Sequence, residues 1–189
     1  VREMNLWLNH VGEAVVVAPL APGEPDALDL AYHHPNLRFV KVPAIDFTSR
    51  ASAFRSLLAL PYILFVLLRE MFKTNHIHLR CPGNMGLLGV FVQILFPFKQ
   101  KTVKYANNWD WRSRQASTYR IQQYILRSQW LTHRAKVLVY GDWQETSRNI
   151  VPFYTASYTN ADKLPVTVRH LSANSTIELV FVGTITANK

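Results

Sequence analysis

Residues 76–89 read His76-Ile77-His78-Leu79-Arg80-Cys81-Pro82-Gly83-Asn84-Met85-Gly86-Leu87-Leu88-Gly89. The first part of this stretch predicts a strand, Pro82 and Gly83 predict a loop, and the apolar residues that follow predict a helix. A strand that leads through a glycine loop into a helix is typical of α/β proteins, in which parallel strands alternate with helices.

The same alternation continues on both sides of this stretch. Further helices are expected over Val1–His10 and near residues 50–73, 84–96 and 116–134. The strands expected in order along the chain are 14–18, 37–42, 76–80, 102–106, 136–140 and 177–182. The predicted fold class is therefore α/β, with a Rossmann-like parallel sheet that carries helices on both faces.

Composition favours one ordinary hydrophobic core. The chain has 189 residues, 49% of them hydrophobic, and a single cysteine, so an internal disulfide is excluded. Its net charge of +9 is concentrated between Lys99 and Lys136, where nine basic residues stand against Asp110 alone. Such a segment favours an anionic partner, namely a phosphate-bearing substrate, an acidic lipid surface or nucleic acid, although a solvated basic face is the equal alternative.

Two apolar runs bear on membrane contact. Leu57–Leu68 is an unbroken run of twelve apolar residues that contains Pro61, and Met85–Phe98 is interrupted by Gln93 and Pro97. Both are shorter than the roughly 20 residues of a membrane span, so we expect buried or interfacial helices. An apolar helix beside a basic segment also fits peripheral contact with an anionic membrane.

Glycines in the loop after residues 76–80 suggest a ligand site. Gly83 and Gly86 would let a ligand approach the backbone, and the free N–H groups at the start of the next helix favour anions. The alternative is that these glycines serve a tight turn and close helix packing. Arg120, Arg127 and Arg134 recur every seven residues and are expected on one helix face, beside an apolar stripe of Ile121, Tyr124, Ile125, Ser128 and Leu131.

The chain resembles glycosyltransferases of the GT-B architecture, family 4 type. The resemblance rests on residues 76–89, on Thr102–Asp110, and on Ile177–Lys189, where a strand meets a glycine turn and a lysine. It implies that residues 1–174 are an N-terminal acceptor-side domain lacking its first strand. Residues 175–189 would then be the first strand and turn of a C-terminal nucleotide-sugar-binding domain whose remainder is missing.

The resemblance also implies a site at each domain. Acceptor-binding residues are expected at Arg80, Gly83, Asn84, Asn107, Asn108, Trp109, Asp110 and Arg112, with the rings of Trp109 and Trp111 stacking on sugars or, alternatively, packing under a loop. Donor phosphates are expected at Gly183, Thr184 and Lys189. Thr184 stands where the family often has arginine, asparagines stand where it often has histidine, and its E-x7-E motif is absent. The catalytic residues are not identified.

The implied function is transfer of a sugar, with retention, from a nucleotide-sugar to a polysaccharide or lipid-linked acceptor. The enzyme would be metal-independent and bacterial, and would work in the cytoplasm or at the inner face of the membrane, while the fragment alone would be inactive. The alternative is a noncatalytic sugar- or anionic-lipid-binding module. Nucleic-acid binding is disfavoured because no motif for it is present. His33, His34, His76 and His78 lack the carboxylates or thiols of a metal site.

Overall fold

The computed structural model describes residues 2–21, 23–24, 29–110, 112–143, 147–154, 163 and 165. The chain divides into two compact units, residues 1–155 and 156–189. Nearly all of the described residues belong to the first unit, and the fold below is that of this unit alone.

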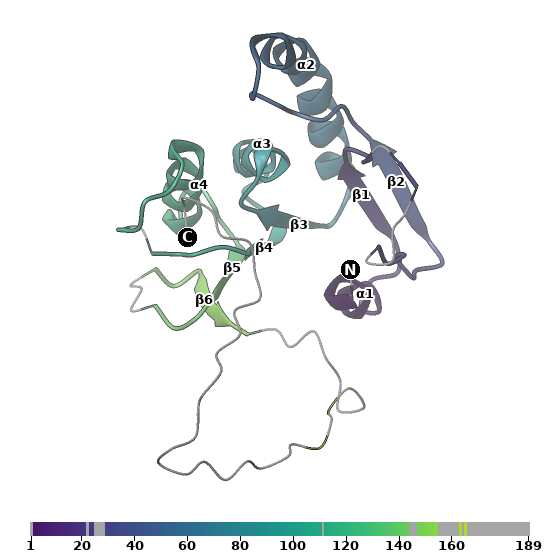
Figure 1. Cartoon of the computed structure of the whole chain (residues 1–189). Helices are drawn as coiled ribbons and strands as arrows, with labels where there is room; N and C mark the ends of the chain where they lie inside the picture. Colours follow the sequence, from purple (N-terminus) through teal and green to yellow (C-terminus); the bar gives the residue numbers. More distant parts are fainter. Residues whose placement is uncertain are drawn as a thin grey trace, which may run out of the picture. The chain divides into compact units, whose positions relative to one another are not determined.

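The first unit is an α/β structure with parallel sheets flanked by helices (Figure 1). One sheet has the order β1-β2 and the other has the order β3-β4-β5-β6, and every described pairing is parallel. This confirms the predicted α/β class with its parallel sheet. The elements in chain order are α1 (Arg2–Leu8), β1 (Ala14–Ala18), β2 (Leu37–Lys41), α2 (Arg50–Lys73), β3 (His76–Cys81), α3 (Asn84–Val92), the 3-10 helix η1 (Gln93–Leu95), β4 (Gln100–Tyr105), α4 (Ser117–Arg127), β5 (Ala135–Tyr140) and β6 (Ile150–Phe153).

The long helix α2 begins at a capping box and packs through one face only. Ser49 accepts a hydrogen bond from the backbone N–H of Ser52, whose hydroxyl accepts one from the N–H of Ser49. The buried Glu70 pairs with Arg38 of β2, which ties the helix to the first sheet. Its buried apolar residues are Ile63, Val66, Leu67 and Met71.

In the larger sheet, α2, α3 and α4 lie over one face and α1 lies over the other (Figure 1). Alternation within β3 directs Ile77, Leu79 and Cys81 into the core that α2, α3 and α4 cover. His76, His78 and Arg80 lie on the opposite face, where the ring of Trp7 in α1 lies edge-on to His78, 4.4 Å between centroids. The chain thus has helices on both faces of this sheet.

Two local predictions are wrong, and one strand was not predicted. The helix expected over 116–134 ends at Arg127, and Arg134 has left-handed backbone with φ of 54°. The expected apolar stripe is also displaced, because Ile121 and Tyr124 are exposed while Gln122 and Gln123 are buried with Ile125 and Leu126. Strand β6 was not expected. The strand expected at 177–182 and the domain boundary at 174 lie outside the described residues.

Candidate functional site

The carboxyl ends of β3 and β4 bring two of the predicted loops side by side. Cys81 is in register with Tyr105, and the N–H of Ala106 donates to the carbonyl of Cys81 at 2.6 Å. The loop containing Gly83 and Asn84 therefore starts beside the loop containing Asn107 and Asn108. Ligands of open parallel sheets bind at this edge, beyond the carboxyl ends of the strands.

The glycines of the first loop have different roles. A Cβ on Gly83 would meet no atom within 4 Å, so the space above this residue is open. A Cβ on Gly86 would lie 2.6 Å from the carbonyl oxygen of Arg80, and one on Gly89 would lie 2.7 Å from Leu79 Cδ2. Gly86 and Gly89 therefore serve close packing of α3 against β3. Gly83 alone fits the expected approach of a ligand to the backbone.

A side-chain hydrogen bond from Asn84 connects the start of α3 to a neighbouring loop. Its amide Nδ2 donates to the carbonyl of Ile45 at 2.8 Å, and the N–H of Leu87 donates to the carbonyl of Gly83 at 2.8 Å, closing the first turn. The exposed Asn84 thus has a structural bond at the edge of the predicted site. The N–H groups of this first helical turn lie next to the open space at Gly83.

The loop after β4 is held in shape by its own polar side chains. Oδ1 of Asn107, Asn108 and Asp110 accept from the backbone N–H groups of Asn108, Asp110 and Arg112, at 2.8 to 2.9 Å. Gln115 braces the loop by donating to the carbonyl oxygens of Asn108 and Asp110. These three side-chain oxygens accept hydrogen bonds within the loop and so stabilise its backbone turns. Asn107 and Asn108 are exposed, so a ligand would meet two side chains whose positions are already ordered.

Trp109 corrects the prediction of a sugar-stacking ring. Its side chain is 0% exposed, Tyr105 lies edge-on to it at 4.9 Å between centroids, and Arg127 lies over it. A ring without an exposed face cannot stack on a sugar, so the alternative, packing beneath a loop, holds for Trp109. Trp111 lies outside the described residues. Arg112 is exposed and Asp110 is half-buried at the same loop.

A polar cluster that sequence reasoning missed lies on the α1 face, next to Arg80. Lys104 is buried and pairs with Glu3 of α1, and its Nζ lies 5.3 Å from the ring centroid of Tyr140 and 5.5 Å from that of Phe153. Side chains of a strand alternate between the two faces of a sheet. Arg80 of β3 and Lys104 of β4 are in register, so this alternation could have predicted that they lie together on one face.

His78 is the most perturbed group in this cluster. Burial lowers its pKa to about 4, and the nearby charges of His76, Lys104 and Arg80 act in the same direction. Neither ring nitrogen has a hydrogen-bond partner among the described residues. The imidazole of His78 is therefore neutral at physiological pH. The positively charged side chains of this cluster are those of Arg80 and Lys104.

The basic segment between Lys99 and Lys136 does not form one charged stripe. Lys99 donates to the carbonyls of Met71, Phe72 and Thr74 at the end of α2, and the buried Lys101 donates to the carbonyl of His133. The predicted face of Arg120, Arg127 and Arg134 is also wrong, because Arg134 lies beyond the helix and donates to the carbonyl of Phe98. Much of this charge therefore serves to stabilise the fold.

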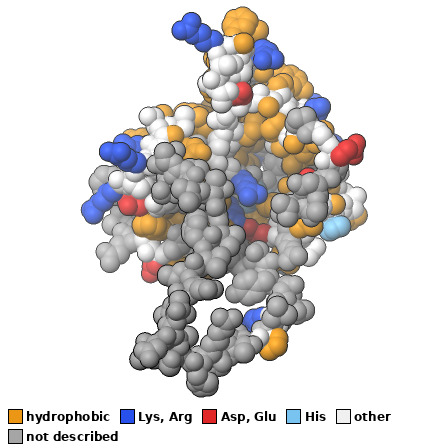
Figure 2. All heavy atoms as spheres, viewed as in Figure 1, with side chains coloured by type: hydrophobic (Ala, Val, Ile, Leu, Met, Phe, Trp, Pro, Cys, Tyr) orange, Lys and Arg blue, Asp and Glu red, His pale blue; other side chains and the backbone are white. Residues whose placement is uncertain are grey.

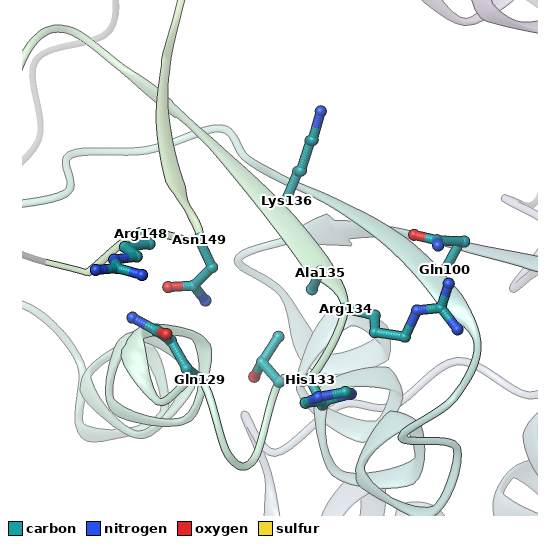
Figure 3. Close-up of a pocket in the computed structure, with 9 residues that line it drawn as sticks. Gln100, Gln129, His133, Arg134, Ala135, Lys136, Arg148 and Asn149 are labelled. Carbon is teal, nitrogen blue, oxygen red and sulfur yellow. The ribbon is translucent and has the colours of Figure 1, made fainter.

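A depression of about 470 Å³ lies at the other end of the sheet, at the amino ends of β4 and β5 (Figure 3). Gln129, Arg148 and Asn149 lie on one side of it and Arg134 on the other (Figure 3). His133 contacts the carbonyl of Pro97 at 2.8 Å, and Asn149 donates to the carbonyl of Leu126 at 2.6 Å. These side chains connect neighbouring loops through hydrogen bonds. The depression lies at the amino ends of the strands, whereas open parallel sheets bind ligands at the carboxyl ends.

The part of the chain that the structure describes offers neither a reactive cysteine nor a cluster of metal-binding side chains. Cys81 is buried, which raises the pKa of its thiol to about 12, so it is a poor nucleophile. No cluster of three or more His, Cys, Asp or Glu side chains occurs among these residues. The predicted donor residues Gly183, Thr184 and Lys189 lie outside them.

No family model, no curated protein and no solved structure matches the chain.

Proposed function

We propose that the chain is the acceptor-side part of a retaining glycosyltransferase, which transfers a sugar from a nucleotide-sugar to a polysaccharide or lipid-linked acceptor. The observation that carries this proposal is the edge formed by the carboxyl ends of β3 and β4. There the open backbone at Gly83, the amino end of α3, and the ordered pair Asn107 and Asn108 lie at one edge of a parallel sheet.

The chemistry of this edge suits binding of an acceptor. Asparagine amides donate to and accept from sugar hydroxyls, but they cannot remove a proton as a base. Arg80 and the N–H groups of α3 favour a phosphate or pyrophosphate group on the acceptor. The part of the site that the structure describes would therefore bind and orient the acceptor.

The donor side of the proposal rests on the sequence alone. Gly183, Thr184 and Lys189 would contact the phosphates of the nucleotide-sugar, and electrostatic stabilisation of the departing diphosphate would supply the rate enhancement. Under this proposal the protein works in the cytoplasm or at the inner face of the membrane and needs no resident metal.

A second candidate function is binding of an anionic lipid surface, and a specific observation favours it. One face of α2 leaves large apolar side chains in solvent, and Figure 2 shows hydrophobic and basic side chains together at the end of α2 at the top of the view. We call this set the α2 apolar face: Phe54, Leu57, Leu58, Tyr62, Phe65, Leu68 and Phe72.

The α2 apolar face has the features of an interfacial helix. Arg50, Arg55, Arg69 and Lys73 are exposed at its two ends, while its acidic residue, Glu70, is buried against Arg38. By length and composition α2 could also cross a membrane. Its opposite face lies in the core, so a position along the membrane surface explains both faces. This second function is compatible with the first, because a lipid-linked acceptor is presented at such a surface.

Binding measurements separate the two candidates. The probe for the first is a short-chain polyprenyl-pyrophosphate-linked N-acetylglucosamine, titrated into the chain without vesicles. The first function predicts saturable binding that Asn107→Ala with Asn108→Ala weakens about tenfold, the loss of one or two hydrogen bonds. Binding to vesicles of phosphatidylcholine with phosphatidylglycerol, together with no binding of the free probe, would support the lipid-binding module and overturn the first proposal.

A further inference from the structure

The depression at the amino ends of β4 and β5 gathers positive charge that no described acidic side chain balances. Of the nine residues that line it, Arg134, Lys136 and Arg148 are cationic and none is Asp or Glu. Lys136 and Arg148 are exposed, and neither side chain has a hydrogen bond or ion pair with a described residue. Lys99 and Lys101, by contrast, donate to backbone carbonyls. The depression therefore keeps cations that are available to a ligand.

Arg134 is held in a fixed orientation at this depression. Its backbone is left-handed, with φ of 54°, and its Nη1 donates to the carbonyl of Phe98 at 2.9 Å. The amide oxygen of Gln100, in the orientation that satisfies both side chains, accepts from Nε and Nη2 of Arg134. A guanidinium has more N–H donors in its plane than these bonds use, so donors remain for a ligand. Figure 3 shows Arg134 and Gln100 on one side of the depression and Arg148 on the other.

Like charges stand close together at the same place. The side chain of the buried Lys101 donates to the carbonyl of His133 at 2.8 Å, and its backbone N–H donates to the carbonyl of Arg134 at 3.1 Å. Burial lowers the pKa of Lys101 to about 8, and the positive charge of Arg134 acts in the same direction. A negative charge bound at the depression would relieve this repulsion. The site therefore favours an anion over a neutral ligand.

Polar amide side chains stand beside the cations. Gln129 and Asn149 lie on the same side of the depression as Arg148 (Figure 3). Asn149 is 8% exposed and donates through Nδ2 to the carbonyl of Leu126, while its Oδ1 has no hydrogen-bond partner among the described residues. Buried polar atoms in proteins normally have such a partner. A hydroxyl on the ligand, or a water that the ligand holds, would supply the missing donor.

The size and charge of the depression indicate the kind of anion. Its volume of about 470 Å³ lies within the range of small-molecule sites, about 300–1,000 Å³. A phosphomonoester carries a charge of about −1.5 to −2 at pH 7, whereas each phosphodiester of a nucleic acid carries a single charge. Several cations around one small depression therefore suit a terminal phosphate or a pyrophosphate better than a chain of diesters.

We propose that the depression at the amino ends of β4 and β5 binds a small ligand through a terminal phosphate or pyrophosphate group, held by Arg134, Lys136 and Arg148. The phosphate belongs either to a molecule free in solution or to the headgroup of a phosphomonoester lipid. Gly83 and Asn107 lie at the opposite ends of the strands. The depression is therefore separate from the proposed acceptor site, and this inference does not depend on the proposed function.

Inorganic pyrophosphate, titrated into the whole chain and followed by NMR of the backbone amides, tests the site. We expect saturable shifts of the amides of residues 132–136. Lys136→Gln with Arg148→Gln should weaken this binding at least about tenfold, because each change removes a charged hydrogen-bond donor. Lys41→Gln with Arg120→Gln is the matched control, since it removes the same charge from exposed positions elsewhere and should leave the affinity unchanged.

A second variant separates this site from the acceptor site. Asn107→Ala with Asn108→Ala should leave the pyrophosphate shifts of residues 132–136 unchanged, whatever it does to binding of the acceptor probe. Loss of these shifts in that variant would show that pyrophosphate binds at the carboxyl ends of the strands and would overturn the proposal.

Co-sedimentation with vesicles of phosphatidylcholine and phosphatidic acid identifies the source of the phosphate. Weaker vesicle binding by Lys136→Gln with Arg148→Gln than by the control pair would assign a lipid headgroup. Equal vesicle binding by the two pairs, with the loss of pyrophosphate binding confined to the first pair, would assign a free ligand. Equal loss of pyrophosphate binding in both pairs would overturn the proposal, and so would shifts at residues 132–136 with single-stranded DNA but none with pyrophosphate.

Discussion

The guanidinium carbon of Arg127 lies 5.1 Å from the ring centroid of Trp109. This contact joins α4 to the loop after β4, and the edge-on ring of Tyr105 closes another side of the indole. A cation over an aromatic face adds stability when both groups are removed from water. The pair therefore supports the loop that carries Asn107 and Asn108 from below, and Trp109 is part of the core.

Replacing Trp109 should destabilise the fold. We expect Trp109→Ala to lower the free energy of unfolding by about 3–5 kcal/mol, because it leaves a cavity where a fully buried indole was. Urea denaturation measures this change. Tyr124→Ala, at a ring that is 72% exposed, is the control and should change the free energy by less than about 0.5 kcal/mol. Equal effects of the two variants would contradict the burial of Trp109.

Gly86 is expected to tolerate no side chain. Its Cβ would lie 2.6 Å from a backbone carbonyl oxygen, which cannot move without shifting β3, so Gly86→Ala should cost about 1–3 kcal/mol of stability. Thermal unfolding checks this. Gly12→Ala is the matched control, since a Cβ there meets nothing within 4 Å. A Gly86→Ala protein as stable as the Gly12→Ala protein would refute the close contact of α3 with β3.

Stability should rise with pH between about 4 and 6.5 because of His78. The folded state protonates this imidazole only below its pKa of about 4, whereas the unfolded chain protonates it below about 6.5. The unfolded state holds more protons in this window, so lowering the pH through it should remove up to about 3 kcal/mol.

His78→Phe isolates this contribution, because His76, Arg80, Lys104 and Glu3 remain around the site. Urea denaturation at several pH values should show a shallower dependence for the variant than for the parent chain. The same dependence in both proteins would mean that His78 is protonated as easily in the folded state as in the unfolded one.

The α2 apolar face should bind anionic vesicles. Phe65→Ser removes a large side chain that is 62% exposed, and we expect it to weaken binding to phosphatidylglycerol-containing vesicles about tenfold in co-sedimentation. Trp130→Ser, at a ring that is 92% exposed outside this face, is the control and should leave binding unchanged. Equal losses in both variants would assign the binding to general surface hydrophobicity.

Much of the fold could be predicted because its elements carry strong local patterns. The apolar runs of β1 and β3 and the long α2 lie close to their expected bounds. The end of α4 could not be predicted from arginine spacing, since a polar spacing of seven continues by chance beyond the point where Arg134 adopts a left-handed conformation. β6 was not predicted because it is four residues long and contains Pro152, a residue that disfavours strands.

The site was harder to predict than the fold. Only the family resemblance assigned the loops after β3 and β4 to one site, and the shared edge at the carboxyl ends of parallel strands is the physical reason that they meet. The sequence could not show that Trp109 is buried, since the covering residues Tyr105 and Arg127 come from a strand and a distant helix. The partners of Lys99 and Lys101 likewise depend on tertiary contacts, so net charge overstated the basic surface.

An NMR titration of the chain with the short-chain polyprenyl-pyrophosphate-linked N-acetylglucosamine tests the proposed acceptor site directly. We expect saturable shifts of the backbone amides of Gly83, Asn84, Asn107 and Asn108, at the carboxyl ends of β3 and β4. Shifts confined to the depression around Lys136 and Arg148, or no shifts at all, would contradict the assignment of an acceptor site to this edge.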